Sequence, residues 1–164
     1  MNYITIITIN IIFISMGFAQ SNLVLNPSFE LFTLCPNNSG IINNGKLTHC
    51  SNPNILSPDY YNICDSVSFS NANHVPDNIC GYQTPKEGNA YVGLATWTLS
   101  YNGGEYIQMK LANLLSNSHH YAFKCYLSNA ECGNYGASDI GVYFSNDSVY
   151  NPSMLLPYSP QIQN

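Results

Sequence analysis

Aromatic and polar side chains alternate with apolar ones along four stretches in the second half of the chain. In residues 90–97, 105–111, 121–128 and 139–145, apolar residues recur at every second position over most of the stretch. Aromatic rings can stack on the apolar faces of a sugar ring, and amide or ammonium groups can donate hydrogen bonds to its hydroxyls. The pattern therefore indicates a sugar-binding surface, whose candidate residues are Tyr91, Trp97, Tyr106, Gln108, Lys124, Tyr126 and Tyr143.

The same residues have a second interpretation, in which they only pack against one another on the outer face of a sheet. Tyrosines favour strands and stabilise them through cross-strand pairs. Trp97, the only tryptophan, shows the choice most clearly. Alternation places it on the face of Tyr91, opposite Val92 and Leu94. It is expected either to stack on a sugar from an exposed position or to close the end of the core.

No catalytic residues are predicted. The sequence has no nucleophile elbow, no zinc-protease helix motif, no phosphate-binding loop and no dinucleotide fingerprint. The adjacent His119 and His120 would face opposite sides of a strand and would not easily share one metal ion, so a solvated turn is expected there. We therefore expect a protein that is not an enzyme.

The charge balance excludes one class of partner. The net charge is −5, and the basic residues are four scattered lysines with no arginine. Binding to nucleic acid needs clustered cations, so no nucleic-acid partner is expected. Only 8% of the residues are charged, whereas 45% are hydrophobic, and the polarity comes from Asn, Ser and Thr. This composition suits an extracellular β protein with neutral, hydrogen-bonding loops.

A structural calcium ion is the one cofactor that the sequence suggests. Calcium binds carboxylates and loop carbonyls, and Glu30 and Asp139 are acidic residues near expected turns. The turn at residues 26–30 offers both kinds of oxygen. The alternative is a capped turn with a solvated carboxylate.

Six cysteines, an even number, suggest disulfides in an exported chain. Without a Cys-x-x-Cys pair, a zinc ribbon is disfavoured. Short separation favours a Cys125–Cys132 bridge and pairing among the first four cysteines, for example Cys35 with Cys64. Free buried thiols are the alternative. The candidates are Cys35, Cys50, Cys64, Cys80, Cys125 and Cys132.

The first twenty residues resemble a secretory signal peptide, because an isoleucine-rich run ends in small residues. Cleavage is expected near Ala19 or Gln20, with an uncleaved membrane anchor as the alternative. The remaining residues, 21–164, suffice for one domain, and no transmembrane span is expected after cleavage.

Period-2 alternation in the four stretches predicts half-buried antiparallel strands. Ile107, Met109 and Leu111 share one face of their stretch, and Tyr121, Phe123, Cys125 and Leu127 share one face of theirs. A further short strand is expected within residues 22–30, whereas residues 33–78 are rich in turn formers and are expected to be irregular. The predicted fold class is all-β, in the form of a jelly-roll sandwich.

Several short motifs in a fixed order resemble a known family. The opening Asn22-Leu-Val-Leu-Asn-Pro-Ser-Phe-Glu30 is similar to the first strand of CenC-type carbohydrate-binding modules, which have a galactose-binding-like jelly roll. The whole order resembles a group of exported proteins from Bacteroidetes. The motifs are Asn26 to Glu30, Cys35-Pro36, Pro58 to Cys64, Gly81 to Gln83, Gly88 to Gly93, Glu105 to Gln108 and Ile140 to Ser145.

The resemblance implies an exported protein that is periplasmic, extracellular or associated with the outer membrane, as in gliding and type IX secretion systems. It also implies strands beyond the end of this chain, so we expect a jelly roll that lacks its last strands. The expected function is a non-catalytic glycan-binding or adhesive module at the cell surface. The alternatives are a structural cell-envelope module with a protein partner, and an accessory fragment of a secreted hydrolase.

Overall fold

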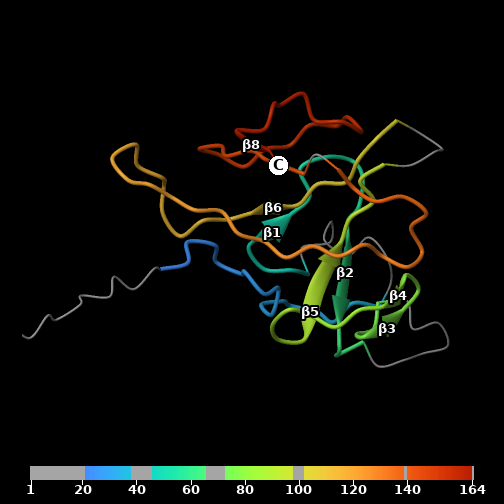
Figure 1. Cartoon of the computed structure of the whole chain (residues 1–164). Coiled ribbons are helices and arrows are strands. Elements are labelled where there is room, and N and C mark those ends of the chain that lie inside the picture. The colour runs from blue at the N-terminus through green and yellow to red at the C-terminus, as the bar shows by residue number, and fades with distance from the viewer. Residues whose placement is uncertain (1–20, 38–45, 66–72, 98–101, 139, 164) are drawn as a thin grey trace, which may run out of the picture.

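Short antiparallel strand pairs form the regular structure of the chain. The computed structural model describes residues 21–37, 46–65, 73–97, 102–138 and 140–163, so the expected signal segment and Asp139 lie outside the described residues. Within these ranges there is no helix, which confirms the predicted all-β class. The pairs are β1 (Cys50–Ser51) with β6 (Gln108–Met109), β2 (Asp59–Asn62) with β5 (Ala90–Gly93), β3 (Asp77–Asn78) with β4 (Gly81–Tyr82), and β7 (Gly141–Val142) with β8 (Ile162–Gln163) (Figure 1).

The β2–β5 pair is the longest and organises the centre of the molecule (Figure 1). Its register places Tyr60 opposite Val92 and Tyr61 opposite Tyr91. Tyr60 and Val92 belong to the core, whereas the rings of Tyr61 and Tyr91 stack with centroids 4.9 Å apart. Successive residues of a strand point to opposite faces, which explains this division. The predicted alternation of Tyr91 and Val92 is thereby confirmed.

The hydrophobic core is small and combines both halves of the sequence. Leu47, Cys50, Tyr60 and Ala90 are buried together. Four partly buried residues pack against them, namely Phe29, Val92, Ile107 and Met109. The common inward face of Ile107 and Met109 was predicted. The contribution of residues 33–78 to the core was not predicted. Their many turn formers indicated irregular structure and gave no sign that the apolar residues between them are buried.

The opening segment pairs with the residues that follow β6. Val24 forms an antiparallel bridge with Leu111, and the Leu25 N–H donates to the Lys110 carbonyl at 3.1 Å. The Ala112 N–H donates in turn to the Leu23 carbonyl at 2.8 Å. The expected strand within residues 22–30 is thus reduced to a bridge, which holds the N-terminal part of the described chain against the core.

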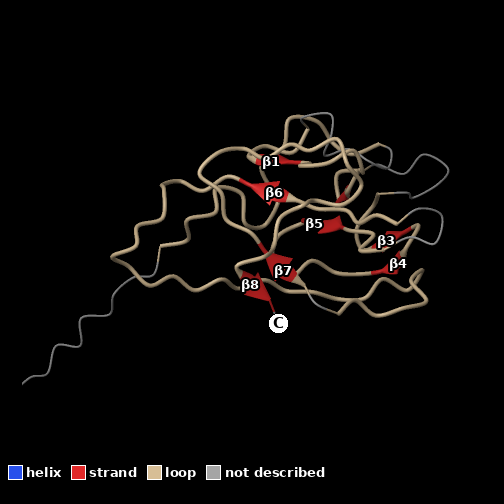
Figure 2. Cartoon of the chain, turned by 90° about the horizontal axis from the view of Figure 1, so that it is seen from above, coloured by secondary structure: helices blue, strands red, loops and turns tan. Residues whose placement is uncertain are grey.

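Residues 121–128 do not form the predicted strand. Every residue from 112 to 138 is exposed, and the stretch is drawn as loop in Figure 2. A strand needs a neighbour that completes its ladder of backbone hydrogen bonds, and no described segment provides one here. The period-2 pattern is present in the sequence, but it has no partner.

Two disulfides join distant segments. Cys35 pairs with Cys64, as the sequence suggested, with Cα atoms 5.9 Å apart. Cys80 pairs with Cys132 across 52 residues, with Cα atoms 4.7 Å apart. The expected Cys125–Cys132 bridge is therefore wrong. The chain runs from His120 to Ala130 without a turn or sharp bend, so Cys125 does not fold back toward Cys132.

Cys50 is free and buried, and Cys125 is free and exposed. Two disulfides are typical of a protein that folds in an oxidising compartment. Among the described residues, no helix is long and apolar enough to span a membrane.

Candidate functional site

The Asn-Pro-Ser-Phe-Glu motif forms a turn that is held from inside the protein. Asn26 is 2% exposed, and its side-chain amide donates to the carbonyls of Leu31 and Thr48 at 3.0 and 2.9 Å. Its side-chain oxygen accepts the Leu31 N–H at 3.0 Å. Phe29 adopts a left-handed backbone conformation, with φ of 61°. The motif that supports the family resemblance is thus a structural turn, because its polar groups are used within the fold.

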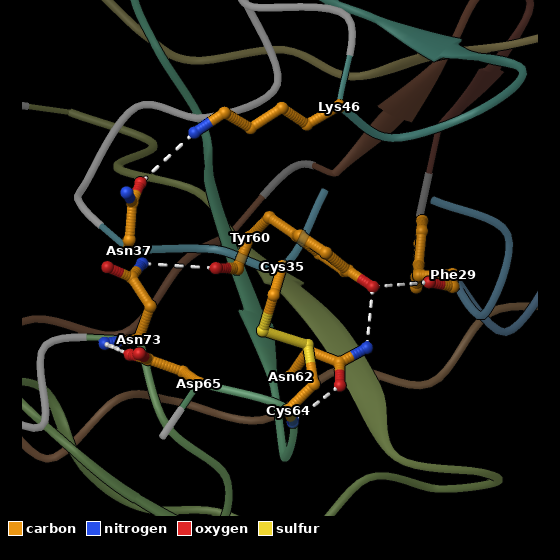
Figure 3. Close-up of a disulfide and its surroundings, with 9 residues drawn as sticks. All are labelled: Phe29, Cys35, Asn37, Lys46, Tyr60, Asn62, Cys64, Asp65 and Asn73. Atoms are coloured by element: carbon orange, nitrogen blue, oxygen red, sulfur yellow. Dashed lines mark hydrogen bonds between the residues drawn. A yellow bond between two sulfur atoms is a disulfide. The ribbon is translucent and has the colours of Figure 1, made fainter. Parts of the chain in front are cut away.

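Tyr60 links this turn to the centre of the molecule (Figure 3). Its hydroxyl donates to the Phe29 carbonyl at 2.8 Å and accepts a hydrogen bond from the Asn62 amide at 2.7 Å. The Asn73 amide donates to the Tyr60 carbonyl at 3.0 Å. Burial raises the pKa of Tyr60 to about 12. Burial keeps the phenol neutral, whereas the hydrogen bond from Asn62 acts in the opposite direction. The network lies beside the Cys35–Cys64 disulfide and is structural.

Glu30, a candidate calcium ligand, contacts Asn89 just before β5. One oxygen of its carboxylate accepts the Asn89 N–H at 2.6 Å, and the other lies 3.5 Å from the Asn89 side-chain amide. Gly88 leaves room for this contact, because a Cβ at its position would collide with the carboxylate. Within the described ranges, no three His, Cys, Asp or Glu side chains form a group that could hold a metal ion. A calcium ion at Glu30 therefore stays a prediction.

The exposed ring of Tyr126 is the centre of the candidate binding site. The ammonium of Lys86 lies 4.7 Å from the centre of this ring, and that of Lys124 lies 5.0 Å from it. A hydrogen bond from Lys124 holds the pKa of the Tyr126 phenol below its ordinary value, and the same bond raises the pKa of Lys124. Two of the four lysines of an acidic protein thus meet at one aromatic ring. We call Lys86, Lys124 and Tyr126 the Tyr126 site.

The β3–β4 hairpin and the disulfide position this site. Cys132 is bonded to Cys80, and its N–H donates to the Cys80 carbonyl at 3.2 Å. The Ser128 hydroxyl donates to Gln83 at 2.8 Å, on the chain that leads from β4 to Lys86. These contacts bring residues 126–132 next to residues 80–86. The site is therefore assembled by a bridge between segments far apart in the sequence.

The other candidate residues are distributed over separate contacts. Tyr91 stacks on Tyr61, and its hydroxyl accepts a hydrogen bond from Asn78 at 2.6 Å. Tyr143 stacks on Tyr158 with ring centres 4.9 Å apart. Tyr106 is half-buried, and its hydroxyl lies near Gly104. These tyrosines pack within the protein, as the alternative interpretation allowed.

Gln108 and Trp97 differ from the tyrosines. The amide of Gln108 donates to the hydroxyls of Ser51 and Ser148 at 2.8 and 3.0 Å, so it joins two segments. Trp97 is 56% exposed and does not close the core. No ring contact or hydrogen bond between described residues joins Trp97 to the Tyr126 site. Of the seven candidates, the structure therefore brings together only Lys124 and Tyr126.

Sequence reasoning missed Lys86 as a member of the site. Lys86 lies in a bend after β4, outside the four alternating stretches that supplied the candidates. The sequence nevertheless contained a signal, because Cys80 is close in sequence to Lys86, and Cys132 is close to Tyr126. A correct disulfide pairing would have placed the two segments together.

Comparisons with known proteins identify no relative of this chain. The chain has no significant match to a protein-family model, to a curated protein or to a solved structure.

Proposed function

We propose that this chain is a non-catalytic, exported binding module whose ligand is a glycan bound at the Tyr126 site. The observation that carries the proposal is an exposed aromatic ring beside two ammonium groups. An aromatic ring offers a surface for the apolar face of a sugar, and the ammonium groups offer hydrogen bonds and positive charge. The proposed ligand is a glycan with carboxylate or sulfate groups.

The overall charge supports an acidic glycan at this position. The protein carries a net charge of −5, so its overall charge disfavours the approach of anions. Two of its four lysines are gathered at one ring, although Glu87 beside them reduces the local positive charge. An acidic sugar would therefore approach the Tyr126 site more favourably than other parts of the surface.

The proposal includes a fold and a location. The small antiparallel pairs belong, on this view, to a galactose-binding-like jelly roll of the CenC type. The two disulfides support an exported protein at the outer membrane, in the periplasm or outside the cell.

A structural envelope protein with a protein partner is the second candidate function. The observation in its favour is the exposed stretch 112–138, which includes several large apolar side chains. Protein interfaces bury such side chains, whereas a glycan site needs few of them. A glycan array separates the two candidates, because only the first requires saturable binding to sugars.

The test is binding of the oxidised chain to an array of acidic and neutral glycans, followed by titration of the best ligand. We expect Tyr126→Ala and the double variant Lys86→Ala with Lys124→Ala each to weaken binding by roughly tenfold or more, as expected when a stacking or charged contact is lost. Tyr135→Ala and Lys110→Ala are the matched controls, because both residues are exposed outside the site. Controls that lose as much affinity as the site variants would contradict the proposal.

A further inference from the structure

Residues 120–130 form a strand-like segment that pairs with no other strand among the described residues, and we call it the free segment. It contains no turn or sharp bend, and all its side chains are exposed. From Tyr121 to Asn129, no backbone N–H or C=O forms a hydrogen bond with any described residue. It is drawn in Figure 1 as the orange trace that crosses β2 and β5 in this view. An open strand edge of this kind is a template for pairing with another strand.

The sequence of the free segment is self-complementary in one antiparallel register. If two copies pair about a twofold axis through Cys125, Phe123 of each copy lies opposite Leu127 of the other. Lys124 of each copy then lies opposite Tyr126 of the other. Apolar pairs and lysine–aromatic pairs across strands both stabilise a sheet. The register therefore contains no aliphatic residue opposite a charged one between positions 123 and 127.

The free thiol of Cys125 lies on the axis of this register. Directly opposed residues of an antiparallel pair have Cα atoms roughly 4.5 or 5.5 Å apart, and disulfides need about 4.4–6.8 Å. Cys125 is exposed, whereas the other free thiol, Cys50, is buried in the core. Only Cys125 is therefore available for a bond between two copies.

We propose that two copies of this chain pair through the free segment, antiparallel about Cys125, and that a Cys125–Cys125 disulfide locks the dimer. The oxidant is a small disulfide such as oxidised glutathione. Two thiols lose two protons and two electrons to form the S–S bond, and the small disulfide takes them up and leaves as two thiols. An isologous contact of this kind closes on itself and stops at the dimer.

Pairing would also double the Tyr126 site. Lys124 and Tyr126 alternate with Cys125, so both copies present them on the same face of the paired strands. Two binding sites side by side would increase the avidity for a polymeric ligand. The dimer itself does not depend on glycan binding, so failure of one proposal leaves the other standing.

The first experiment measures dimer formation by the oxidised chain in a glutathione redox buffer, followed by non-reducing electrophoresis, light scattering and peptide mapping. We expect a covalent dimer whose bridging peptide is Cys125–Cys125. Cys125→Ser should abolish the covalent dimer. A bridge through Cys50, an internal Cys50–Cys125 bond or a protein that stays monomeric would each overturn the proposal.

The second experiment tests the register, because an exposed thiol can also oxidise without specific pairing. In a homodimer of Phe123→Lys or of Leu127→Asp, the introduced charge of each copy lies opposite an apolar residue of the other. Each variant alone should therefore dimerise at least about tenfold more slowly than the wild type. In a mixture of the two variants, the introduced lysine of one copy would lie opposite the introduced aspartate of the other. Covalent heterodimers should therefore form in preference to homodimers.

The control for the register is Leu114→Asp, at an exposed apolar residue outside the free segment. This variant should dimerise normally, because it adds the same negative charge as Leu127→Asp but lies outside the proposed contact. Equal yields of homodimers and heterodimers in the mixture would overturn the register.

Discussion

Buried polar side chains connect the segments of this protein that have no regular structure. Asn26 makes two hydrogen bonds to the backbone of Leu31, at the end of the opening turn, and one to the Thr48 carbonyl, and Tyr60 connects this turn to β2. Buried polar groups are costly when they lose a partner, so such residues stabilise one conformation against its alternatives. The fold therefore depends on single hydroxyl and amide groups.

Replacing Tyr60 with phenylalanine tests this dependence. The change keeps the ring in the core but leaves the Phe29 carbonyl and the Asn62 amide without the hydroxyl. We expect the free energy of unfolding to fall by about 1–3 kcal/mol. Urea unfolding measures it. Tyr82→Phe is the control, because Tyr82 is 63% exposed and should show a change near zero.

Alkaline pH should destabilise the protein through buried groups that include Tyr60 and Cys50. Burial raises the pKa of Tyr60 from 10.0 to about 12 and that of Cys50 from 9.0 to about 11. The unfolded chain loses these protons first, so their contribution to stability is complete below about pH 9 and is lost as the pH rises to about 12. Urea midpoints measured between pH 8 and pH 11 should fall. Tyr60→Phe should show a smaller decrease than the wild type over this range.

Trp97 is expected to contribute little to stability. Because 56% of the side chain is exposed, Trp97→Ala should shift the melting temperature only slightly. Removing a tryptophan from a tightly packed core would cost about 3–5 kcal/mol. Thermal unfolding followed by circular dichroism distinguishes these cases. A loss of several kcal/mol would show that Trp97 is packed after all.

At the scale of elements, the sequence predicted which neighbouring residues face opposite sides better than it predicted where whole strands form. The division of Tyr91 and Val92 between two faces was correct, because a period of two depends only on the strand backbone. The predicted strand at 121–128 was wrong, because the same period says nothing about whether a neighbouring strand exists. The predicted set of site residues omitted Lys86 for a related reason: Lys86 reaches Tyr126 through a disulfide pairing that sequence separation did not reveal.

The disulfide pattern gives a count of reactive thiols. Native protein should react at one thiol, Cys125, because Cys50 is buried. After unfolding without a reductant, two thiols should react, and the four cysteines of the two bridges should not. Titration with a thiol reagent in the presence and absence of denaturant measures both counts. Six reactive thiols in the unfolded, unreduced protein would contradict both bridges.

At the scale of the whole molecule, the exposed stretch 112–138 contrasts with the small core. Segments without buried contacts open easily and are preferred sites of proteolysis. Trypsin should cut native monomer first after Lys124. The two fragments should stay together until reduction, because Cys132 in the second fragment is bonded to Cys80 in the first. Electrophoresis with and without reductant tests this, and an early cut after Lys110 would contradict it.

The two disulfides also determine how the chain responds to mechanical tension. They close loops with separations of 29 and 52 residues, one after the other along the sequence. Force applied to the two ends of an unfolded, oxidised chain cannot extend either loop. At about 3.5 Å per residue, the loops withhold roughly 100 and 180 Å of length until a reductant opens them. A chain pulled at both ends would therefore reach a smaller maximum length while the bridges are intact, even after its core has unfolded.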